Sequence, residues 1–187
     1  MRYTCTRFAV LIAALFLNAC QTNQQSSEAT KPADSTEMTT NRPDSEQDAT
    51  PSDWLAKLMG PNDGLFRGVK LGDAVSDVKA KEEAEPFEED ADHLGYTIEY
   101  ENLESVDIQY FLDKNKKVSG IQVDIYLNNR KSVDEHTKEL TDYFTRQYGQ
   151  PAQQSWKIAG KDRVTLTDVS KGKDFGLKLT FGSTPGV

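Results

Sequence analysis

Alternation of apolar and polar residues is the strongest pattern in the second half of the chain. It runs through residues 96–100, 106–112 and 118–127, and returns in 156–158, 164–169 and 175–181. Successive side chains of a strand point to opposite faces, so this pattern predicts antiparallel strands with one buried and one solvated face. A one-residue shift of the alternation near Gly120 predicts a β-bulge.

Apolar residues at helical spacing predict the helices. The clearest helix starts at a capping box, Ser132 to Glu135, and ends at Gly149 before Pro151. Its expected apolar face consists of Val133, His136, Leu140, Phe144 and Tyr148.

Two further helical segments precede the strands. Residues 54–59 form a short possible helix that Gly60 and Pro61 stop. Asp73 has the character of an N-cap for a helix that runs to about residue 84, before Pro86. The segment between them, 64–72, is expected to be a strand or an extended loop.

The element order is helix, three strands, helix, three strands. It predicts an α+β domain at residues 54–187, with an antiparallel sheet of about six strands and two helices packed on one face. The order also suggests a tandem of two αβββ units, although the two halves show no obvious sequence identity.

The segment before this domain has a different composition. Residues 21–53 contain no Val, Ile, Leu or aromatic residue and are dominated by small and polar residues. Such a segment cannot bury enough apolar surface to offset its ordering entropy, so we expect a disordered tether with an r.m.s. span of roughly 30 Å. The alternative is a recognition tail that orders when it binds a partner.

The first twenty residues combine three signals. Arg2 and Arg7 make a basic start, residues 8–17 are an apolar run too short to span a bilayer, and Leu17-Asn18-Ala19-Cys20 follows. This arrangement resembles a bacterial lipoprotein signal with its lipobox; the alternative is an ordinary signal peptide with an incidental cysteine.

The lipoprotein resemblance implies how the chain is anchored. Residues 1–19 would be a signal peptide, and Cys20 would carry fatty-acyl chains such as palmitate that hold the protein on the lipid bilayer. Residues 20–53 would then comprise the lipidated Cys20 and the tether. Gln21 after the cysteine implies the outer membrane, if the host is Gram-negative.

Charge and cysteine content narrow the function classes. Loss of Arg2 and Arg7 with the signal leaves 20 basic against 30 acidic residues, a net charge near −10. This balance argues against nucleic acid and against electrostatic binding to anionic lipid. Cys5 is also lost with the signal, so neither a disulfide nor a thiol nucleophile is expected.

Candidate chemistry is sparse in the predicted domain. His136 belongs to a helix face, and His93 lies in a polar segment without another His or Cys nearby, so we expect no metal site. The acidic run 82–92 is expected to be a solvated loop; the alternatives are a weak calcium site or a docking patch. Residues 113–118 fail the calcium-loop pattern, and 68–72 lack a phosphate-binding pattern. We therefore expect no catalytic residue and no cofactor.

Three short segments are similar to small envelope lipoproteins of the SmpA/OmlA (BamE-like) and β-lactamase-inhibitor-protein-like group. They are the helix start at 66–78, the hairpin at 108–118 and the helix exit at 148–151, together about a third of the domain. The second helix and three more strands depart from the BamE pattern. The resemblance implies a non-enzymatic binding or assembly role through a sheet face.

Our leading hypothesis is therefore an envelope lipoprotein that presents a binding or assembly module to another envelope protein. One alternative is an inhibitor or immunity lipoprotein, suggested by the acidic surface and the inhibitor-like sheet. The other is a hydrolase whose site has no recognisable motif.

Overall fold

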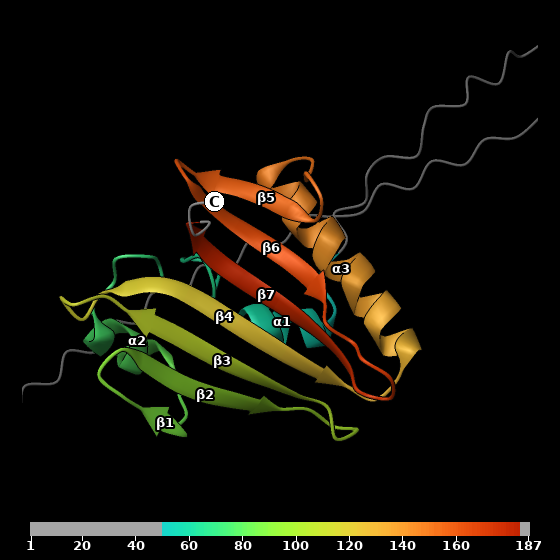
Figure 1. Ribbon diagram of the computed structural model, residues 1–187, viewed down its shortest axis with the longest axis horizontal. Helices are drawn as coiled ribbons and strands as arrows, with labels where there is room; N and C mark the ends of the chain where they lie inside the picture. Colours follow the sequence, from blue (N-terminus) through green and yellow to red (C-terminus); the bar gives the residue numbers. More distant parts are fainter. Residues whose placement is uncertain (1–49, 184–187) are drawn as a thin grey trace, which may run out of the picture. The chain divides into compact units, whose positions relative to one another are not determined.

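The computed structural model describes residues 50–183, which form one seven-stranded antiparallel sheet and three helices (Figure 1). The helices are α1 (Asp53–Met59), α2 (Val75–Lys81) and α3 (Arg130–Tyr148). The strands are β1 (Glu88–Glu89), β2 (His93–Glu99), β3 (Ser105–Leu112), β4 (Val118–Leu127), β5 (Ser155–Ala159), β6 (Asp162–Asp168) and β7 (Phe175–Ser183). The predicted α+β class is confirmed, and the short helix suggested at 54–59 is present as α1. The sheet has one strand more than the six expected, and α1 is a third helix beside the two of the expected architecture.

The predicted signal segment 1–19, Cys20 and most of the tether lie outside the described residues. The description begins just before α1, where the Ser52 hydroxyl accepts a hydrogen bond from the Leu55 N–H at 3.1 Å. Across residues 50–183, none of the helices is both long and apolar enough to cross a membrane.

The strand order is β1-β2-β3-β4-β7-β6-β5, so β4 and β7 form the centre of the sheet (Figure 1). The predicted bulge is present. Phe111 pairs with Gly120 and Leu112 pairs with Val118, which leaves Ser119 as the extra residue of β4. The segment 64–72 is a loop with one isolated bridge between Phe66 and Val69.

One face of the sheet, the covered face, forms the core. Its best-filled row crosses six strands through Leu94, Tyr110, Ile121, Phe181, Val164 and Trp156, all buried. Each helix adds buried residues to the same core, Leu55 and Leu58 from α1, Val78 from α2, and Val133, Leu140 and Phe144 from α3. The Phe144 ring lies 5.4 Å from the Trp156 ring and 6.0 Å from the Phe181 ring, centroid to centroid.

The predicted N-cap of the long helix, Ser132, was wrong by three residues. α3 begins at Arg130, and its N-cap is Asn129, whose side-chain oxygen accepts a hydrogen bond from the Ser132 N–H at 3.0 Å. Ser132 is thus a residue of the first helical turn. Its backbone N–H is capped by Asn129, and its own side chain does not cap the helix. The predicted end is confirmed, because Gly149 is the C-cap and has a positive φ of 83°.

The predicted cap of α2 was also wrong. Ala74 is the N-cap, and the Asp77 carboxylate accepts a hydrogen bond from its N–H at 3.2 Å. Asp73 instead accepts from the Lys70 N–H at 2.9 Å and tightens the preceding turn. The helix ends at Lys81, before the predicted residue 84.

Candidate functional site

The face of the sheet opposite the helices, the open face, carries the candidate binding surface. Strand pairing aligns its residues in rows across the sheet. One row joins Phe111, Gly120, Gly182 and Arg163, and the next joins Gln109, Gln122, Thr180 and Thr165. A mostly polar surface is the usual state of a solvated sheet face, but aromatic and glycine residues interrupt this one.

Three exposed aromatic side chains lie on the open face, and one of them, Phe87, packs over Gly95 of β2. Phe111 of β3 is 38% exposed and Tyr126 of β4 is 51% exposed. Each of these two is directly paired with a glycine, Phe111 with Gly120 and Tyr126 with Gly176. Because glycine has no side chain, the sheet surface next to each aromatic ring is depressed at the glycine position.

These depressions are two hollows. The larger, of about 270 Å³, is bounded by Phe111, Gln122, Arg163 and Thr180 over the glycines of the β4–β7 pair. The smaller, of about 120 Å³, lies at the other end of the same two strands and is bounded by Asp124, Tyr126 and Val169 around Gly176. Both combine apolar edges with a few polar groups, which is the usual make-up of a binding surface.

The polar side chains of the open face largely pair with one another. Lys178 Nζ lies 3.1 Å from Asp124 Oδ1, and the Thr97 hydroxyl donates to Asp107 Oδ1 at 2.7 Å. Arg163 Nε donates to the Ser155 hydroxyl at 2.9 Å. These contacts fix the side chains around the hollows and present a preformed surface.

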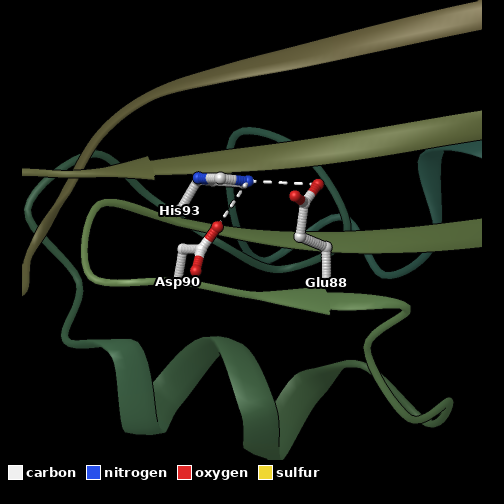
Figure 2. A group of neighbouring side chains, drawn as sticks. All are labelled: Glu88, Asp90 and His93. Atoms are coloured by element: carbon white, nitrogen blue, oxygen red, sulfur yellow. Dashed lines mark ion pairs between the residues drawn. The ribbon is translucent and has the colours of Figure 1, made fainter.

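A cluster of titratable side chains lies at the β1–β2 hairpin, where His93 of β2 faces Glu88 of β1 and Asp90 of the turn (Figure 2). His93 Nε2 lies 3.2 Å from Glu88 Oε2 and 3.9 Å from Asp90 Oδ2. The other ring nitrogen, Nδ1, lies 3.0 Å from Asp92 Oδ1. Hydrogen bonds that the His93 ring donates to the carboxylates of Asp92 and then Glu88 raise the pKa of His93 above its usual value.

The predicted acidic run does not behave as one solvated loop. Glu82 is buried, with 3% of its side chain exposed, and both of its oxygens accept hydrogen bonds from Arg67 Nε, at 3.0 and 2.9 Å. The Tyr110 hydroxyl also donates to Glu82. Burial, and then the Glu82 charge, raises the pKa of Tyr110. This network joins α2 to β3 and has no opening to a hollow described above, so we assign it to stability.

His136 is a packing residue, as the sequence predicted. Its ring stacks on Trp54 of α1, with centroids 3.7 Å apart and planes 15° apart. Burial lowers the pKa of His136, and the nearby carboxylates of Glu104 and Glu139 oppose that shift. The stack connects α3 to the first turn of α1.

The sequence predictions for site residues therefore have different outcomes. Cys20, the one residue assigned a chemical role, lies outside residues 50–183. The cluster at His93 was missed, although the spacing of Glu88, Asp90 and His93 is that of a tight hairpin. The open-face hollows were missed as well, because they depend on pairing between strands distant in sequence. The chain matches no family model, no curated protein and no solved structure.

Proposed function

We propose that the chain is a lipid-anchored envelope lipoprotein that presents a non-catalytic binding module, and that the open face of its sheet contacts another envelope protein. The single observation that carries the proposal is the pair of glycine-floored hollows, each bordered by an exposed aromatic residue. The backbone itself requires two of these glycines, Gly176 and Gly182, whereas a face that only met solvent would not need the exposed aromatic residues beside them.

The aromatic residues support protein binding over solvation. Aromatic side chains are enriched in protein interfaces, and the residues that dominate binding energy cluster in well-packed pockets at the centre of an interface. Phe111 and Tyr126 lie on adjacent strands at the two ends of the open face. A partner that filled both hollows would contact the full length of the two central strands.

The fold also supports a finer proposal, that the domain is a tandem of two αβββ units. The first unit would be α2 with β2, β3 and β4, and the second would be α3 with β5, β6 and β7. The strand order places β4 beside β7, so the last strands of the two units meet in the centre. The larger hollow, over Gly120 and Gly182, then lies on the junction between the units.

The anchor part of the proposal rests on Cys20 and the acidic charge. A domain with excess negative charge does not bind anionic lipid by itself, so acyl chains on Cys20 would hold it at the membrane. Cells fed a fatty-acid probe should label the wild-type chain and not the Cys20→Ala variant. Equal labelling, or unchanged membrane association of the variant, would show that the anchor proposal is wrong.

The docking part is tested by recovery of partners from crosslinked membranes. Wild type is compared with a double variant, Phe111→Ser with Tyr126→Ser, and with a matched surface control, Lys131→Ser with Lys138→Ser. Both control positions are exposed on α3. We expect wild type and the control to recover the same protein and the open-face variant to lose it at least about tenfold, since hot-spot residues carry most of the binding energy.

A partner that the open-face variant recovers as well as wild type would contradict the docking surface. Recovery of no partner above background by wild type would contradict the binding function itself.

A further inference from the structure

The hairpin cluster of Glu88, Asp90 and His93 has the components of a metal site that the docking proposal does not use. Its three ligand atoms, one imidazole nitrogen and two carboxylate oxygens, all lie within 4.8 Å of one another. In Figure 2 the three side chains point toward a common space above the hairpin turn. The imidazole distinguishes this cluster from the exposed acidic groups around it.

The spacing fits a small divalent ion. Zn²⁺ binds nitrogen and oxygen ligands at about 2.0–2.2 Å in tetrahedral sites, which places neighbouring ligand atoms about 3.3 Å apart. The distances from His93 Nε2, 3.2 Å to Glu88 and 3.9 Å to Asp90, lie close to that value. Side-chain shifts of roughly an ångström would bring the three ligand atoms to tetrahedral spacing, with water in the fourth position.

His93 already has the outer partner that metal-bound histidines commonly have. Asp92 Oδ1 lies 3.0 Å from Nδ1, so Nδ1–H donates to Asp92 and leaves Nε2 directed at the other two carboxylates. A carboxylate on the remote nitrogen orients the ring and strengthens its bond to a metal. The cluster therefore contains three inner ligands and one orienting residue.

Hydrogen bonds within the turn and from the β3–β4 region hold the backbone of the hairpin in place. The Asp90 N–H donates to the His93 carbonyl at 2.9 Å and closes the turn, and the Leu112 N–H donates to the Asp92 carbonyl at 2.7 Å. Lys116 donates to the carbonyl of Ala91. Ligands on such a braced turn need little reorganisation to bind an ion.

We propose that Glu88, Asp90 and His93 bind a divalent first-row transition ion of the Zn²⁺ type, with Asp92 as the residue that orients His93. Imidazole suits such ions, whereas Ca²⁺ and Mg²⁺ select sites of oxygen ligands. The ordinary ion pair between His93 and its carboxylates is the competing account. The site lies at the β1–β2 edge of the sheet, where His93 is the cross-strand partner of Phe111. It adjoins the docking surface but does not rest on the docking proposal.

The test is calorimetric titration of Zn²⁺ into the metal-free full chain, purified in detergent with an affinity tag that contains no histidine. Wild type should bind one equivalent, and His93→Gln, Glu88→Gln and Asp90→Asn should each weaken binding at least about tenfold. Asp92→Asn should weaken it by about 10-fold or more, as loss of an outer partner does.

Two control variants test whether loss of Zn²⁺ binding is specific to the proposed ligands. Glu85→Gln removes an exposed charge from the same acidic run, and His136→Gln removes the other histidine; both should bind Zn²⁺ as wild type does. Circular dichroism confirms that every variant is folded. Absence of binding up to about 1 mM Zn²⁺, which corresponds to a negligible affinity, would overturn the proposal. Binding that His93→Gln leaves unchanged, or a preference for Ca²⁺ over Zn²⁺, would overturn it as well.

Discussion

The two faces of the sheet are built from the same strands but differ in the kinds of residue that they present. On the covered face, pairing aligns large apolar side chains such as Tyr110, Phe181 and Trp156, and three helices close over them. On the open face, the same pairing aligns exposed Phe111 with two glycines. Core packing dictates the first set of residues. In the second set, the positive φ of Gly182 requires that glycine, whereas the core requires neither exposed Phe111 nor Gly120. This difference is why we assign the proposed binding surface to the open face.

The two histidines extend this comparison. His93 projects on the side of the open face, because its neighbour Leu94 is buried on the other side, and it sits among carboxylates. His136 lies under Trp54 on the helix side. The pKa of His93 is raised by its partners, and the pKa of His136 is lowered by burial.

The largest effect should come from emptying the covered face. Trp156 is fully buried, and its Nε1–H donates to the Thr145 hydroxyl at 3.2 Å. Trp156→Ala should lower the free energy of unfolding of the full chain by about 4 kcal/mol, by loss of buried area and creation of a cavity. Urea unfolding followed by circular dichroism measures it. The open-face control Tyr126→Ala should cost under about 1 kcal/mol; similar losses for both would erase the difference between the faces.

A second large effect should come from Glu82. Glu82→Ala leaves the Arg67 guanidinium without its carboxylate and the Tyr110 hydroxyl without its acceptor, and removing one partner of a buried pair costs about 3 kcal/mol. Glu85→Ala, an exposed neighbour in the same acidic run, should change stability by under about 0.5 kcal/mol. Equal small losses in urea unfolding would mean that Glu82 is solvated after all.

A smaller effect on stability, with a large effect on binding, is expected at Gly120. A Cβ there would lie 3.4 Å from the Phe181 carbonyl oxygen, an ordinary contact. Gly120→Val should therefore stay within about 1 kcal/mol of wild type, fill the larger hollow and reduce partner recovery.

Gly176 offers the contrasting glycine. A Cβ there would lie only 2.8 Å from the Ile125 carbonyl oxygen, so Gly176→Ala should be destabilising by about 1–3 kcal/mol. If urea unfolding shows Gly120→Val to be the more destabilised variant, the space over Gly120 is not a hollow.

The smallest expected effect is the dependence of stability on pH. The folded pKa of His136 is below the unfolded value of 6.5, so folded protein binds fewer protons at this site. Its contribution to stability is present above pH 6.5 and is lost as pH falls through the folded pKa. His93 has the opposite sign, so its contribution is present below 6.5 and is lost as pH rises through its folded pKa. NMR titration of the two imidazoles should give values on opposite sides of 6.5, and the reverse order would contradict the assignment of environments.

The sequence predicted what local pattern determines. Alternation located the strands, the shift at Gly120 located the bulge, and Gly149 located the end of α3. The N-cap of α3 was predicted at Ser132, but Asn129, three residues earlier, is of an equally suitable residue type and is the one that caps the helix. β1 has two residues, both Glu, and so lacks any apolar pattern.

The candidate sites depended on tertiary structure. Burial of Glu82 requires Arg67 and Tyr110, which lie 15 and 28 residues away along the chain. The larger hollow requires Gly120 of β4 to pair with Gly182 of β7, across α3 and two intervening strands. Neither composition nor local sequence pattern predicts these contacts between residues distant in the chain.

The most direct test of the docking surface is a photo-crosslinking map in living cells. A photoreactive amino acid is placed at Gln122 or Thr180 on the open face, and at Lys131 or Lys138 on the outer side of α3. The proposed function predicts a discrete adduct with one envelope protein from the open-face positions and none from the helix positions. Adducts from α3 alone, or no adduct from the open face, would contradict it.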